Sequence, residues 1–83
     1  MKKTLHFVPA QVCSSAIDLT VEDGIVKEVC FTGGCNGNLQ GISLLVKDMK
    51  VEEVIGKLEG IRCGSKRTSC PDQLVTALRK MQD

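Results

Sequence analysis

The sequence has few aromatic side chains, one histidine and no long apolar run, and each shortage excludes a class of protein or site. Phe7 and Phe31 are the only large rings, so the core must be aliphatic. His6 is the only histidine, and nothing in the sequence orients it toward a nucleophile, so hydrolysis and group transfer have no positive case. Every uninterrupted apolar run is far shorter than the ~20 residues that span a bilayer.

An excess of charge of one sign is also missing. The formal net charge is +1 at pH 7, with acidic and basic residues interspersed, which gives no general attraction to nucleic acid or to a membrane surface. Two lysines near the start resemble the charged region of a signal peptide, but no apolar region of adequate length follows them. We therefore expect a cytoplasmic protein that binds no membrane and has no nucleic acid as a partner.

The length predicts a single domain over residues 1–83. Apolar residues make up 42% of the chain, which is typical of a folded protein. A chain this short buries only a thin core, so many such domains depend on a metal, on disulfides or on a partner for stability.

Cysteine is the residue type that the chain has in unusual number. There are five cysteines: Cys13, Cys30, Cys35, Cys63 and Cys70. The count is odd and no export signal is visible, so a complete disulfide framework is not expected. No two cysteines have the C-x-x-C spacing of a zinc ribbon. In a reducing compartment, clustered cysteines bind metal or carry out redox chemistry.

Four of the cysteines lie at the boundaries of predicted elements. Cys13 precedes a predicted hairpin and Cys35 follows it, while Cys63 and Cys70 lie in the connection before the last helix. Cys35 and Cys70 stand at predicted helix N-termini, where the partial positive charge favours thiolate. Four thiolates suit tetrahedral zinc or an iron–sulfur cluster. The alternatives are small buried side chains and loop thiols, or a Cys63–Cys70 disulfide.

The remaining candidate residues favour structural roles. Cys30 lies within a predicted strand on the face that it shares with Glu28 and Thr32, so we expect it to have no part in the site. His6 lies in the first strand and is expected to be structural. One basic cluster lies before the last helix: Arg62, Lys66 and Arg67. It forms either a solvated loop or a contact for an anion or a partner.

The apolar pattern predicts an α+β fold, in which a three-stranded antiparallel sheet precedes three helices packed on one face. A strand over residues 4–9 is followed by a hairpin over 16–32 that turns at Asp23-Gly24. The returning strand is expected to place Val29 and Phe31 on the same face as Ile25. The first helix starts with Asn38 as its N-cap and continues to residue 49.

Two further helices follow from the same spacing. Residues 51–59 repeat the i, i+3, i+4, i+7 pattern, and Gly60 is placed to end that helix. Pro71 suits the first turn of a last helix over 71–82. Its predicted apolar stripe consists of Leu74, Val75, Leu78 and Met81.

The segment Thr68-Ser69-Cys70-Pro71-Asp72 resembles the signature of the TSCPD domain family, and the match continues through Gln73-Leu74. Gly33-Gly34-Cys35-Asn36-Gly37-Asn38 is similar to that family's second motif, and Cys13 and Cys63 fall at its other cysteine positions. This resemblance implies a four-cysteine metal-binding domain with Cys13, Cys35, Cys63 and Cys70 as ligands. Related domains form the C-terminus of adenosylcobalamin-dependent ribonucleotide reductases.

A weaker resemblance is to the IscU/NifU-type iron–sulfur scaffold proteins. It rests on the order of cysteine, strand, Asp-Gly turn, strand, Gly-Cys, two helices, cysteine and last helix, and it implies an IscU/NifU-like fold. Its implied ligands are Cys13, Cys35 and Cys70. Ser15 and Ser69 replace an aspartate and a histidine of the scaffolds, and Cys63 has no counterpart there.

Three functions follow from these patterns as hypotheses. The first is a zinc or iron–sulfur domain that acts as an accessory or docking module of a protein partner, related to ribonucleotide reductase. The alternatives are an iron–sulfur scaffold or carrier within the iron–sulfur machinery, and a dithiol redox partner that uses Cys63 and Cys70. We expect no reductase turnover by this chain alone, because 83 residues cannot hold both a large barrel and a cofactor site.

Overall fold

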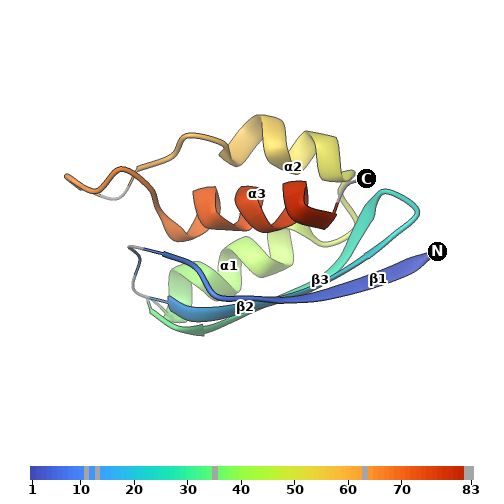
Figure 1. Ribbon diagram of the computed structural model, residues 1–83, viewed down its shortest axis with the longest axis horizontal. Coiled ribbons are helices and arrows are strands. Elements are labelled where there is room, and N and C mark those ends of the chain that lie inside the picture. Colours follow the sequence, from blue (N-terminus) through green and yellow to red (C-terminus); the bar gives the residue numbers. More distant parts are fainter. Residues whose placement is uncertain (11, 13, 35, 63, 82–83) are drawn as a thin grey trace.

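A computed structural model describes residues 1–10, 12, 14–34, 36–62 and 64–81 (Figure 1). Three strands are followed by three helices. They are β1 (Lys2–Phe7), β2 (Ser14–Glu22), β3 (Ile25–Gly33), α1 (Asn36–Val46), α2 (Val51–Leu58) and α3 (Cys70–Met81). The predicted α+β arrangement is therefore confirmed, although the first strand starts two residues earlier than expected. No helix in the described part of the chain is both long enough and apolar enough to cross a membrane.

The sheet is antiparallel with the strand order β1-β2-β3, and the helices lie on one side of it (Figure 1). Alternation along β2 explains this layering. Ile17, Leu19 and Val21 are buried, whereas Asp18 between them is exposed. Because successive side chains of a strand point to opposite faces, one face of the sheet packs on the helices and the other faces solvent.

The tight turn between β2 and β3 has the backbone that its sequence requires. Glu22 pairs with Ile25, which leaves Asp23 and Gly24 as a two-residue connection with φ angles of 53° and 77°. Positive φ at both positions is the type I′ pattern that Asp-Gly favours. The Met1 ammonium donates a hydrogen bond to the Asp23 carboxylate, and this contact holds the pKa of that carboxyl below its usual range.

A β-bulge changes which residues of β3 face the helices. The prediction that Ile25 shares a face with Val29 is wrong, because the register shifts between Thr20 and Val21 and places Val26 opposite Val21. An extra residue in one strand of a pair reverses the alternation beyond it. Val26 is therefore the core residue, fully buried, and Ile25 is only half-buried.

The first helix differs from its prediction at both ends. It begins at Asn36, so Asn38 lies inside it and is not its N-cap, and it ends at Val46 instead of continuing to residue 49. The Asp48 N–H donates to the Val26 carbonyl at 2.7 Å, and the Val26 N–H donates to the Met49 carbonyl at 2.8 Å. Hydrogen bonds to the edge of β3 thus replace the last turn that the apolar spacing predicted.

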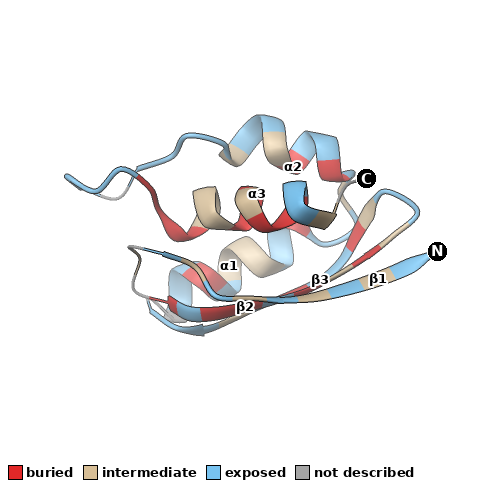
Figure 2. Cartoon of the chain, in the orientation of Figure 1, coloured by how far each residue is buried: buried red, intermediate tan, exposed pale blue. Residues whose placement is uncertain are grey.

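The core lies between the sheet and the helices and is aliphatic. Its largest fully buried side chains come from all layers: Ile17, Val26, Val54, Leu74 and Leu78. The predicted stripe of α3 is confirmed, since Leu74, Val75 and Leu78 are buried and Met81 packs against the core. This packing fixes the N-terminal end of α3 over the sheet (Figure 2).

Candidate functional site

Of the four predicted ligands, the structure describes Cys70. Cys13, Cys35 and Cys63 lie outside the described residues, and the described part of the site consists of Cys70 and the chain neighbours of the other three. Cys70 is the first residue of α3 and is buried. Among the described residues there is no group of three metal-ligating side chains.

Cys70 contacts the first residue of β2. The Ser14 hydroxyl lies 3.2 Å from the Cys70 sulfur, and both residues are buried. Ser14 also pairs with Gly33, the last residue of β3. The start of α3, the start of β2 and the end of β3 therefore meet at one end of the molecule, where α1 also begins (Figure 1).

Ser69 holds the N-terminus of α3. Its hydroxyl accepts a hydrogen bond from the Asp72 N–H at 3.2 Å and donates one to the Ile61 carbonyl at 2.7 Å. A serine at the N-cap satisfies one of the backbone donors that a helix start leaves unpaired. The same serine thereby joins the helix start to the connection that precedes it, next to Cys70.

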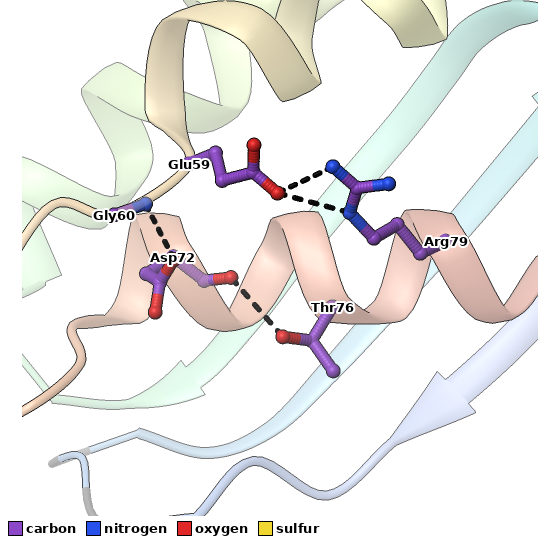
Figure 3. A network of polar contacts seen from close by, with 5 residues as sticks. All are labelled: Glu59, Gly60, Asp72, Thr76 and Arg79. Atoms are coloured by element: carbon purple, nitrogen blue, oxygen red, sulfur yellow. Dashed lines mark hydrogen bonds and ion pairs between the residues drawn. The ribbon is translucent and has the colours of Figure 1, made fainter.

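The Asp72 carboxylate joins the two ends of the connection between α2 and α3, at its base (Figure 3). Its Oδ1 accepts from the Gly60 N–H at 2.7 Å, and its Oδ2 accepts from the Thr68 hydroxyl at 2.5 Å. An acidic residue in the first turn also interacts favourably with the helix dipole. Nearby, the Arg79 guanidinium pairs with the Glu59 carboxylate, which joins α3 to the end of α2 a second time.

Gln73 joins the same region to the connection between β1 and β2. Its Oε1 accepts a hydrogen bond from the Ala10 N–H at 3.1 Å, and its Nε2 donates one to the Thr68 hydroxyl at 3.0 Å. The first turn of α3 thus contacts both long connections of the molecule, the one that contains Cys13 in the sequence and the one that contains Cys63.

The basic cluster lies in the connection between α2 and α3, which extends beyond the helices as exposed chain (Figure 2). Its side chains are exposed: Arg62, Lys66 and Arg67. None of them forms a salt bridge with a described residue, whereas Arg79 is paired with Glu59. Both carboxylate oxygens of Asp72 accept hydrogen bonds from within the fold, from Gly60 and Thr68. This carboxylate is therefore engaged at the base of the connection and not with the basic cluster.

Cys30 and His6 lie on the solvent face of the sheet. Cys30 is exposed and pairs across the strands with Asp18, and the His6 ring Nδ1 lies 2.5 Å from Asp18 Oδ1. Glu28 is on the same face as Cys30, as predicted from the strand pattern. Cys30 is therefore exposed on this face, whereas Cys70 is buried at the start of α3.

Several residues of the site were not identified from the sequence. The spacing of Ser69 and Asp72 is that of a capping box, so this pair had a recognisable signal before the last helix. Ser14 had none, and Gln73 was part of the family motif but carried no signal of its contacts. Their partners are 56 and 63 residues away in the chain, and only the packing of α3 on the sheet brings them together.

The chain is similar to a known protein family. A family model described as the TSCPD domain matches residues 1–82, which is nearly the whole chain. No curated protein and no solved structure matches it.

Proposed function

The chain belongs to the TSCPD domain family, and on that basis we propose that it is a small four-cysteine metal-binding domain. The proposed ligands are Cys13, Cys35, Cys63 and Cys70, and the proposed metal is zinc or an iron–sulfur cluster. We propose further that the domain acts as an accessory module that docks to a larger protein partner related to ribonucleotide reductase.

One observation carries the metal proposal. Cys70 contacts Ser14, the residue after Cys13, and Ser14 pairs with Gly33, two residues before Cys35. Ser14 and Gly33 are one and two residues from Cys13 and Cys35, and consecutive Cα atoms are about 3.8 Å apart. These described neighbours therefore meet Cys70 within a distance that a shared metal could span. This convergence supports a single site more than it supports separate, unrelated thiols.

The chemistry of the described donor fits a thiophilic metal. Cys70 is buried at the start of α3, and cysteine sulfur is a donor that both zinc and iron–sulfur clusters take. The Ser14 hydroxyl is within hydrogen-bond distance of its sulfur, in the position of an outer-shell partner that orients a ligand. When bound, the metal would supply a cross-link between elements that are distant in the sequence.

The docking part of the proposal is supported by the basic cluster. Arg62, Lys66 and Arg67 are exposed, and no described carboxylate pairs with them. Three cations and no aromatic platform are too few for strong binding to nucleic acid. An acidic surface of a protein partner suits them better, and the family resemblance supports a reductase as that partner.

Metal analysis of anaerobically purified protein tests the proposal. We expect about one zinc or one iron–sulfur cluster per chain, and visible absorbance would distinguish the cluster. Cys70→Ser should weaken metal retention, whereas Cys30→Ser, on the opposite face of the sheet, should retain metal like the wild type. No metal in protein never exposed to chelator or oxidant, or equal losses in the two variants, would refute the four-ligand assignment.

A further inference from the structure

The polar side chains after Cys70 are joined in a continuous chain of hydrogen bonds. It begins at the Ala10 N–H, passes through the Gln73 amide and the Thr68 hydroxyl, and ends at the Asp72 carboxylate. The Gly60 N–H donates to the other oxygen of the same carboxylate. The chain therefore starts in the connection between β1 and β2 and ends in the connection between α2 and α3.

The direction of every bond follows from the chemistry of the groups. The Asp72 carboxylate only accepts, so the single proton of the Thr68 hydroxyl must point to it. The lone pairs of that hydroxyl are then available to the NH₂ group of Gln73, and the oxygen of the Gln73 amide is left for the Ala10 N–H. Because each group fixes the orientation of the next, the middle hydroxyl determines the geometry at both ends.

We propose that Thr68 and Gln73 are positioning residues that couple the two cysteine-bearing connections of the fold. Ser14 holds one connection at α3 and Ser69 holds the other, each through its own bond. The chain through Gln73 and Thr68 instead passes from one connection to the other. Its consequence for metal retention rests on the proposed function, while the coupling itself does not.

Hydrogen exchange of individual amides tests the coupling directly. Thr68→Val removes the middle hydroxyl with little change of shape, and it should speed exchange at the Ala10 and Gly60 amides by about 3- to 10-fold. Thr68 bonds to neither amide, so an effect at both ends requires the chain. Thr68→Ser restores the hydroxyl and should restore protection. If Thr68→Val leaves either amide unchanged, the coupling is refuted.

Thr76, one helical turn after Asp72 in α3, provides a matched control. The Thr76 hydroxyl donates to the Asp72 carbonyl within its own helix (Figure 3), so Thr76→Val makes the same chemical change outside the chain of bonds. It should leave both amides within about twofold of the wild type. Equal acceleration in the two variants would show that the loss of any threonine hydroxyl in or next to α3 loosens the region, and the proposal would be refuted.

The rate of zinc release distinguishes a positioning role of Thr68 and Gln73 at the metal site from a general effect on stability. With chelator in excess, Thr68→Val and Gln73→Met should release zinc about 3- to 10-fold faster than the wild type, and Thr76→Val should not. Unchanged release in the first two variants would overturn their positioning role at the metal site. If the wild type holds neither zinc nor an iron–sulfur cluster, the proposed function fails, and the exchange result still decides the coupling.

Discussion

Ser14 and Ser15 are adjacent in β2, yet their hydroxyls have different surroundings. The Ser14 hydroxyl is buried against the Cys70 sulfur, while the exposed Ser15 donates to the Thr32 carbonyl at 3.2 Å. Losing a buried hydrogen bond costs about 0.5–1.5 kcal/mol. We therefore expect Ser14→Ala to lower the free energy of unfolding by about 1 kcal/mol, as measured by urea denaturation of the metal-free protein.

Ser15→Ala is the control for this change. Exposed substitutions usually stay within about 0.5 kcal/mol of the wild type, so the two variants should differ clearly. If the two variants are equally stable, the contact of Ser14 with Cys70 contributes nothing to the stability of the fold, and the role of Ser14 beside the proposed ligand is contradicted.

Gly56, inside α2, and Gly60, just after it, should respond in opposite ways to substitution by alanine. Gly60 has a φ of 84° just after the helix, a conformation that side chains disfavour. Gly56 lies inside α2, and an added Cβ would meet no atom within 4 Å. Gly60→Ala should therefore destabilise by about 1 kcal/mol, whereas Gly56→Ala should stabilise by about 0.5–1 kcal/mol.

Thermal or urea unfolding of the two variants measures this difference. The comparison is informative because the Gly60 N–H also donates to Asp72, so strain at this residue acts on the base of the connection before α3. Stabilisation by Gly60→Ala would mean that the turn after α2 does not require the left-handed conformation of Gly60.

At the scale of the whole molecule, a small aliphatic core makes stability sensitive to a bound metal. A ligand that binds only the folded state stabilises it by about 2.7 kcal/mol at 100 times its dissociation constant. For a domain of this size we expect the melting temperature to rise by roughly 10–20 °C when zinc is added to apo protein. A calorimetric scan with zinc, and a second with chelator, measures the shift.

Cys30→Ser should show the same shift as the wild type, and Cys70→Ser should show a much smaller one. The two variants lose the same sulfur atom from positions of different burial, exposed for Cys30 and buried for Cys70. A zinc-dependent shift that survives in Cys70→Ser would place the metal away from the start of α3.

Local features of the sequence determined the elements of this fold. The Asp23-Gly24 turn, the alternation along β2 and the stripe of Leu74, Val75 and Leu78 were all predicted, because turn chemistry and side-chain periodicity act within one element. The family assignment was likewise carried by short motifs and is confirmed over residues 1–82. The ligand set of Cys13, Cys35, Cys63 and Cys70 stays a prediction, since three of these residues lie outside those described.

How the elements meet depends on tertiary packing, which the sequence pattern does not show. A bulge brings Val26 into the core, and it changes the predicted face of β3. Hydrogen bonds join Val26 to residues 48 and 49, and they change the predicted end of α1. Both features depend on neighbouring strands and loops. The contacts of Ser14 with Cys70 and of Gln73 with Ala10 join residues 56 and 63 positions apart. Periodicity describes which face of an element is apolar, but it carries no information on which polar atom of a distant element will lie within hydrogen-bond distance. Packing of α3 on the sheet settles that, because it fixes both the position and the rotation of the helix whose first turn carries Cys70.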